Sequence, residues 1–197
     1  MKFGWRELMR KWNQAIFSDK NQEYKQYYLS QEALASNWAG KEPASEAQIA
    51  ELERKLGYAL PPSYRSFLRF TNSWELLTHF IYKLYSTDEV DWFRVRHERW
   101  IESLEKISYT IPVTDREYLQ YGKDHSPVIR VEYVRDLLQI SEKGDAAVFV
   151  LNPRIIHGKE WEAWFLTNWG HGVRRYKSFW DLMCDEYDNF IYLLDNP

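Results

Sequence analysis

The chain has a single cysteine, Cys184, among 197 residues, so no disulfide can form within it. It also lacks any run of about 18 apolar residues, the length that a membrane-spanning helix needs. Charged side chains interrupt the apolar residues near the N-terminus, whereas a signal peptide needs an apolar core of about 7–15 residues. These absences predict a cytoplasmic protein that does not contact a membrane.

An excess of positive charge is absent as well, because 26 Lys and Arg face 29 Asp and Glu for a net charge of −3. Direct nucleic-acid binding is therefore disfavoured, since phosphate backbones attract basic surfaces. No histidine forms a spaced pair with another histidine or with the cysteine, as a zinc site requires. We expect no metal and no organic cofactor. The histidines are His79, His97, His125, His157 and His171.

Aromatic residues are abundant, with 10 Trp, 14 Tyr and 10 Phe. Each can bury about 150–250 Å², so the chain can build a large core. Its length favours one domain with an extension. We expect residues 1–37 to be a helical extension packed on the core of a domain that covers residues 38–197; partner binding by this extension is the alternative.

Two helices are expected in the extension. Over residues 5–17, large apolar side chains share one helical face; they are Trp5, Leu8, Met9, Trp12 and Ile16. A second helix is expected over residues 22–36, with Tyr24, Tyr27, Tyr28 and Leu34 as its apolar set.

Residues 45–74 carry the clearest local signals. Ser45 and Gln48 have the spacing of a capping box, which predicts the start of a helix. Gly57 stands where a left-handed C-cap is expected. Leu60 then precedes a Pro61-Pro62 pair that stops the first helix and starts a second one. The apolar residues expected to face the core are Ile49, Leu52, Leu56, Tyr64, Phe67 and Leu68.

This segment resembles the N-terminal signature of the SUKH superfamily, in the branch of the fungal Smi/Knr cell-wall regulators and their bacterial relatives. The matching residues are Ile49, Glu53, Leu56-Gly57, Leu60-Pro61-Pro62, Tyr64, Phe67-Leu68 and Asn72, with Ser73 where glycine is usual. A second block resembles bacterial members in the same order. It comprises Gln139-Ile140-Ser141, Gly144-Asp145, Leu151-Asn152-Pro153, residues 160–164, Trp169, Arg175-Tyr176 and residues 178–183. The resemblance covers roughly residues 38–185.

An α+β fold is expected, with an antiparallel or mixed sheet flanked by helices, and the resemblance implies the same class. Strands are predicted at residues 137–140, 146–151, 161–166 and 174–176, with a turn at Lys143-Gly144-Asp145. Helices are predicted from Thr87 to about Lys106 and from Phe179 to Leu194, and a helical turn within residues 115–121.

The strand at residues 161–166 supplies the first candidate site. Alternation predicts Trp161, Ala163 and Phe165 on the core side, and Glu160, Glu162 and Trp164 on the outer face. The outer three suit a partner surface. Acid–base catalysis by the two glutamates is one alternative, since paired carboxylates hydrolyse glycosides; a solvated strand face is the other.

The final helix supplies the second candidate site. Residues 178–197 contain no Lys or Arg, so their acids can form a face that steers a basic partner. Its proposed contact residues are Asp181, Asp185 and Asp188, with Glu186 and Asp195 nearby. The alternative is the wet side of an amphipathic helix. The same acids disfavour a reactive thiolate at Cys184.

The resemblance implies a non-enzymatic protein-binding module. Bacterial members of the superfamily are often immunity proteins, which neutralise a cognate toxin, frequently a nuclease, by direct contact. A regulatory scaffold of the Smi/Knr type is the alternative, and a hydrolase using Glu160 and Glu162 ranks last. The expected partner is a basic, nuclease-type toxin domain, and the expected oligomeric state is a monomer or a weak homodimer.

Overall fold

The centre of the fold is a five-stranded antiparallel sheet, in the order β3-β4-β5-β6-β7. In this computed structural model the described residues are 3–107, 113–121, 129–168 and 172–196. The strands are β3 (Asp91–Trp92), β4 (Leu138–Gln139), β5 (Ala147–His157), β6 (Glu160–Thr167) and β7 (Val173–Tyr176). Two further short strands, β1 (Trp74–Glu75) and β2 (Lys83–Leu84), form a separate antiparallel pair.

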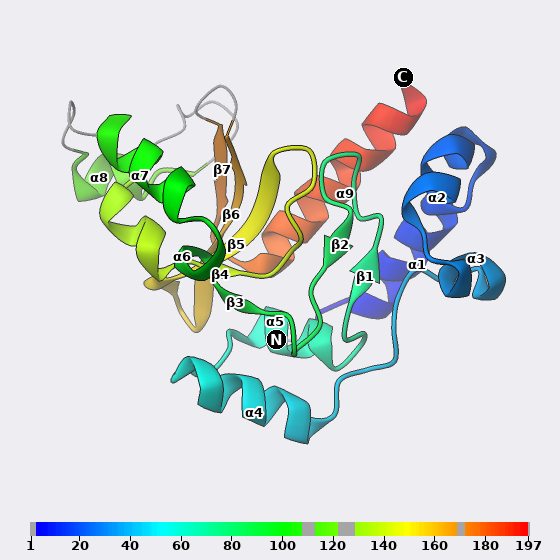
Figure 1. Ribbon diagram of the computed structural model, residues 1–197, viewed down its shortest axis with the longest axis horizontal. Helices are drawn as coiled ribbons and strands as arrows, with labels where there is room; N and C mark the ends of the chain where they lie inside the picture. The colour runs from blue at the N-terminus through cyan, green and yellow to red at the C-terminus, as the bar shows by residue number, and fades with distance from the viewer. Residues whose placement is uncertain (1–2, 108–112, 122–128, 169–171, 197) are drawn as a thin grey trace.

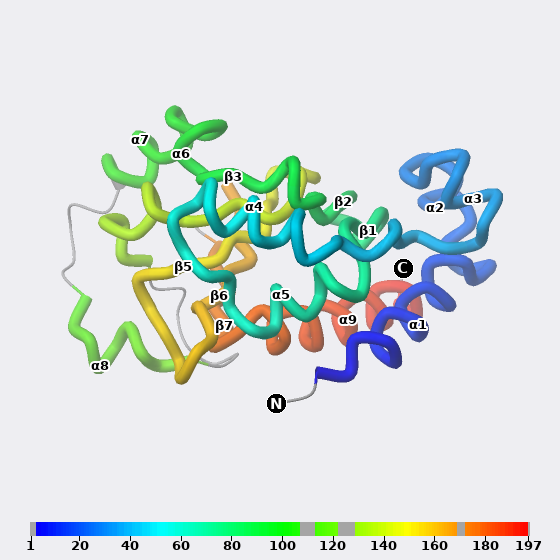
Figure 2. Tube along the Cα trace, turned by 90° about the horizontal axis from the view of Figure 1, so that it is seen from below, coloured from blue at the N-terminus to red at the C-terminus, as the bar shows by residue number. Residues whose placement is uncertain are grey.

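Helices cover both faces of the five-stranded sheet, and the α+β class predicted from the sequence is confirmed. The helices are α1 (Trp5–Ile16), α2 (Gln22–Tyr28), α3 (Gln31–Ser36), α4 (Glu46–Leu56), α5 (Pro62–Leu68), α6 (Phe93–Arg96), α7 (Glu98–Ile107), α8 (Asp115–Tyr118) and α9 (Phe179–Asp195). The 3-10 helices η1 (Asp19–Asn21) and η3 (Val131–Asp136) complete the set. In Figures 1 and 2, α6 to α8 lie at one end of the molecule and α1 to α3 at the other.

Strand alternation divides the interior into two clusters. The first, larger cluster contains Trp161, Ala163 and Phe165 of β6, together with residues of α1, α4, α5 and α9. The second contains Trp164 and Leu166 of β6, with residues of α6, α7, α8 and η3. Both faces of β6 are therefore buried, as in a sheet with helical layers on its two sides.

The corner between α4 and α5 follows its local signals. Ser45 and Gln48 form both hydrogen bonds of a capping box, and Gly57 adopts the left-handed conformation with φ of 74°. Leu60 is buried, and its amide donates to Glu53 Oε1 at 2.9 Å. Pro62 begins α5. Each predicted element of this corner is confirmed, because capping and glycine conformation depend on nearby residues.

Helix α1 packs against α9. Trp5 and Trp12 of α1 are buried, and Trp5 contacts Phe179 of α9 with ring centroids 5.5 Å apart. Residues 22–36 are divided into α2 and α3, because Ser30 caps α3 by accepting from the Ala33 amide. Figures 1 and 2 show α1 running beside α9.

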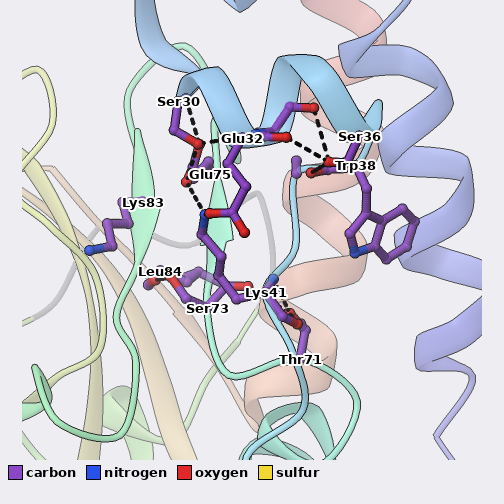
Figure 3. A network of polar contacts seen from close by, with 12 residues as sticks. Ser30, Glu32, Ser36, Trp38, Lys41, Thr71, Ser73, Glu75, Lys83 and Leu84 are labelled. Carbon is purple, nitrogen blue, oxygen red and sulfur yellow. Dashed lines mark hydrogen bonds and ion pairs between the residues drawn. The ribbon is translucent and has the colours of Figure 1, made fainter.

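A buried carboxylate links α3 to β1. Glu75 accepts from the Ser30 amide at 2.8 Å and from the Ser30 hydroxyl at 3.0 Å, and Lys41 lies 3.1 Å away. Lys41 also binds Glu32 at 2.7 Å. Figure 3 shows these side chains converging between the helix and the strand. The network fixes the start of α3 on the domain, since a charged acceptor strengthens each hydrogen bond.

The helix predicted from Thr87 to about Lys106 differs from the structure in two ways. The helix expected from Thr87 begins later, at Phe93, because Asp91 and Trp92 pair with β4 as strand β3. The helix is also divided into α6 and α7 at His97. The predicted turn around Gly144 is present between β4 and β5, where a Cβ would lie 1.9 Å from the Phe80 carbonyl oxygen. Only glycine permits this approach of two backbone segments.

Among the described residues, no helix has both the length and the apolar character needed to cross a bilayer.

Candidate functional site

Glu160, predicted on an outer partner-binding face, caps a helix instead. Its Oε1 accepts from the Ser63 amide at 2.9 Å, and its Oε2 accepts from the Ser63 hydroxyl at 2.6 Å. Ser63 is the second residue of α5, whose N-cap position is Pro61. Because proline offers no side-chain acceptor there, Glu160 supplies the acceptor from another element. Its carboxylate is half-buried and engaged.

Glu162 lies in the interior and not on an outer face, so the sequence-based placement is wrong. Its carboxylate is fully buried. Five side-chain donors surround its two oxygens: Tyr118, Tyr121, Asn152, Trp164 and Arg175, at 2.7–2.9 Å. Each oxygen is saturated by donors, which stabilises a buried carboxylate. No free lone pair faces a substrate, so the geometry argues against the paired-carboxylate chemistry considered for Glu160 and Glu162.

Arg175 neutralises Glu162 from β7. Its side chain is only 6 % exposed, and its guanidinium carbon lies 4.0 Å from the centroid of the Tyr118 ring. Burial, and then the charge of Glu162, raise the pKa of the Tyr118 and Tyr121 hydroxyls. Both therefore remain protonated donors. At the edge, the Tyr121 hydroxyl lies 2.7 Å from His157 Nε2. The group forms a closed polar network inside the second cluster.

Trp164, the third residue predicted on the outer face, is also fully buried. Its indole N–H donates to Glu162 at 2.7 Å, and its ring belongs to the second cluster, which α6 to α8 and η3 cover. The predicted core side, with Trp161, Ala163 and Phe165, is confirmed. The predicted alternation of side chains between the two faces of β6 is correct. Helices from distant parts of the sequence, however, cover the face that was expected to meet solvent.

The acidic residues of α9 separate into buried and exposed groups. Glu186 is buried and lies 2.5 Å from Arg174; burial raises its pKa to about 7. Asp185 is partly buried and accepts from the Tyr176 hydroxyl at 2.7 Å. Asp181 and Asp188 are exposed. Of the predicted contact acids, these two are open to solvent.

An exposed stripe follows the outer side of α9, and we call it the α9 ridge. It consists of Asp181, Asp188, Tyr192 and Asp195, all exposed. Tyr192 is 66 % exposed and was missed from the sequence, although its spacing from Asp188 places both on one helical face. Asp195 binds Lys20 of η1 at 2.6 Å. The ridge therefore combines acids with one open aromatic ring.

A second exposed surface is formed by α2 and residues next to it. Helix α2 has no fully buried residue; of the tyrosines predicted as its apolar set, Tyr24 and Tyr27 are exposed, and Tyr28 is partly buried against the first cluster. Tyr28 stacks on Tyr82 at 4.1 Å between centroids, and Tyr24 lies 4.1 Å from His79. Tyr27 is 82 % exposed. We call Tyr24, Tyr27, Tyr28, His79 and Tyr82 the tyrosine cluster.

The other candidates for reactive chemistry in the sequence are the cysteine and the histidines. Burial, and then the charges of Asp181 and Asp188, raise the pKa of the Cys184 thiol to about 11, so the thiol is protonated at neutral pH. The described parts of the chain hold no group of three His, Cys, Asp or Glu side chains suited to a metal ion. His125, His171 and Trp169 lie outside the described residues.

Comparison with known proteins tests the family resemblance of the two sequence blocks. None of the curated proteins compared with the chain matches it. The model of the SMI1 / KNR4 family (SUKH-1) matches residues 43–185, which run from the loop before α4 into the middle of α9. The match includes the α4–α5 corner, the whole sheet and the buried Glu162 network, and so spans well over half of the sequence. The chain belongs to the SMI1/KNR4 (SUKH-1) family.

Proposed function

We propose that this protein is a non-enzymatic protein-binding module that neutralises a cognate toxin by direct contact, with the α9 ridge as its binding face. The proposal rests on one observation. The ridge presents acids and an exposed tyrosine, and the helix carries no Lys or Arg. Family membership supports a protein-binding role in general. The partner that fits this face is a basic domain, such as a nuclease.

Asp181 lies in the first turn of α9 and favours the helix there, but the placement of Asp195 does not serve the stability of the helix. The C-terminal end of a helix carries partial negative charge, so acids there are unfavourable and bases are favourable. The last turn of α9 contains no base, and it carries Asp195. Lys20 offsets that one residue from outside the helix. A basic partner would compensate the remaining charge, and complementary charge would speed its encounter.

Tyr192 suits the other half of such an interface. Tyrosine is enriched among residues that dominate binding energies, because it buries a large ring and keeps a hydrogen-bonding hydroxyl. On the ridge it is flanked by Asp188 and Asp195. We therefore expect the acids to set the association rate and Tyr192 to set the lifetime of the complex.

The experiment needs a toxin domain encoded beside the gene of this chain; with such a domain, association and dissociation rates are measured at two salt concentrations. Asp188→Lys and Asp181→Lys should slow association and weaken its dependence on salt. Tyr192→Ala should speed dissociation, with a loss of about 2 kcal/mol. The matched controls are Glu42→Lys and Tyr58→Ala, which alter exposed residues on other elements.

If all three ridge variants bind the toxin domain like the parent, the α9 ridge is not the binding face. Loss of binding in Glu42→Lys or Tyr58→Ala, with the ridge variants unaffected, would place the interface near α4. If the neighbouring toxin domain does not bind at all, neutralisation is excluded for that toxin.

A regulatory scaffold of the Smi/Knr type is the second candidate function. The observation that favours it is the tyrosine cluster, most of which lies before the family-matched residues and leaves Tyr27 open to solvent. A scaffold needs a second face in addition to the ridge. Simultaneous binding of two proteins, with one lost in Tyr27→Ala and the other in Asp188→Lys, would support this role over neutralisation.

A further inference from the structure

A hollow of about 390 Å³ lies where α6 meets α7. Its walls come from the α6–α7 junction, with His97 and Trp100, and from the turn between β4 and β5, with Lys143. Both helices cover the second core cluster, whereas α9 packs on the first. The hollow is therefore independent of the α9 ridge and of the function proposed for it.

Positive charge converges on this hollow although the chain as a whole carries −3. Arg96, Arg99 and Lys143 line it, and Glu98 is the one acid among its lining residues. The Glu98 carboxylate is occupied by Arg135 at 2.9 Å. Within the described part of the chain, none of the three cations forms an ion pair with a carboxylate.

Two of the three cations, Arg96 and Lys143, are held by contacts that leave their charge unpaired. Arg96 donates to the Glu89 carbonyl at 2.6 Å and lies over the Tyr85 ring, 5.2 Å from its centroid. Lys143 Nζ lies 6.0 Å from the centroid of the Trp100 ring. Carbonyl and ring contacts orient a cation without neutralising it. An anion in the hollow would complete the charge balance.

The histidine in the wall is partly shielded from water and lies within reach of these charges. His97 packs against Phe93, with centroids 4.7 Å apart, and against Trp100 at 5.6 Å. Burial, and then the charge of Lys143, lower its pKa; an effect of Gln139 opposes them, and the charge of Arg96 makes the smallest contribution to the lowering. The start of α7 at Glu98 adds the positive end of a helix dipole. The hollow thus favours negative charge from several directions.

We infer that the hollow binds the phosphate group of a small phosphorylated molecule. Two guanidinium groups and one ammonium match a multiply charged phosphate, because arginine donates in a planar fork and lysine supplies a point charge. The volume is within the range of small-molecule sites, about 300–1,000 Å³. A single carboxylate ligand would leave part of this charge uncompensated.

The test is isothermal titration calorimetry of the full chain with inorganic phosphate, ADP and adenosine at low salt. ADP should bind and adenosine should not, and added NaCl should weaken binding. Lys143→Glu and Arg99→Glu should each weaken ADP binding at least tenfold. The matched controls, Lys159→Glu and Arg10→Glu, reverse exposed charges elsewhere and should bind ADP like the parent. Circular dichroism verifies the fold of each variant.

Inorganic phosphate and ADP of equal affinity would show that the site recognises the phosphate alone, and tighter binding of ADP would assign a nucleoside phosphate. The inference is overturned if neither phosphorylated compound binds at millimolar concentration. It is equally overturned if Lys143→Glu and Arg99→Glu bind ADP as the parent does, or if adenosine binds as tightly as ADP.

Discussion

The buried pair of Glu162 and Arg175 gives the sharpest test of the packing. Replacing Glu162 by Leu removes the acceptor of five donors and leaves Arg175 buried and unpaired. Breaking a buried ion pair on one side costs about 3–5 kcal/mol. The neighbouring hydroxyl, amide and indole donors that are left without an acceptor add to this cost. We expect Glu162→Leu to lie at the upper end of that range.

The reverse change should cost less. In Arg175→Leu the Glu162 carboxylate keeps four of its donors, namely Tyr118, Tyr121, Asn152 and Trp164. Charge-assisted hydrogen bonds stabilise an anion even without a neighbouring cation. The double variant removes both charges, so its loss should be smaller than the sum of the single losses by about 2–3 kcal/mol.

Urea unfolding of the parent, both single variants and the double variant measures these terms, provided that the m-value is unchanged. The matched control is the same cycle on Glu51 and Arg54, an exposed pair within α4. Solvent screening makes such pairs weak, so its coupling should be indistinguishable from experimental error. The reasoning is refuted if the buried pair couples no more strongly than the exposed one, or if Arg175→Leu costs more than Glu162→Leu.

Two further predictions concern stability. Leu60→Ala should cost about 2–5 kcal/mol in denaturant unfolding, because Leu60 is buried between α4 and α5; a loss below about 0.5 kcal/mol contradicts its role in the corner. Burial raises the pKa of Glu186 from 4.5 to about 7, so the folded state binds more protons than the unfolded state between these values. Stability contributed by this residue should therefore fall as pH rises from about 4.5 to 7, by up to about 3 kcal/mol. Compared with the parent, Glu186→Gln should gain stability between pH 5 and pH 8, and parallel pH profiles of the two proteins would contradict the assignment.

Features that depend on neighbouring residues were predictable from the sequence. The capping box at Ser45 needs only Gln48, and the left-handed Gly57 ends the same helix. Ser30 carried an equally local signal, because its hydroxyl caps α3, and it marks the break inside the single helix expected over residues 22–36. That break was missed although the serine is of the type that favours N-caps.

Features that depend on distant residues were not predictable in this way. Asp91 and Trp92 form a strand only because β4 lies beside them. The local sequence pattern instead predicts a helix that includes both residues. Trp164 follows the correct alternation, but whether its side of β6 is open depends on Phe93, Ile101 and Tyr118. Burial on both faces of a sheet is a property of the assembled layers. Alternation alone separates the two faces and does not say which one meets water.

The same limit explains why composition could not identify the binding face. The carboxylates near the C-terminus look alike in the sequence, yet Glu162 and Glu186 are buried with fixed arginine partners, whereas Asp181 and Asp188 are exposed. Removing a carboxylate of the first kind changes the free energy of unfolding, because it leaves a buried guanidinium or relieves a buried charge. Removing Asp188 leaves folding nearly unchanged and alters mainly what the surface attracts, whereas Asp181 also accepts from the Ser178 hydroxyl in the first turn of α9. An interface on α9 must therefore be sought with variants of the second kind, since loss of binding in a Glu162 or Glu186 variant would report on folding first.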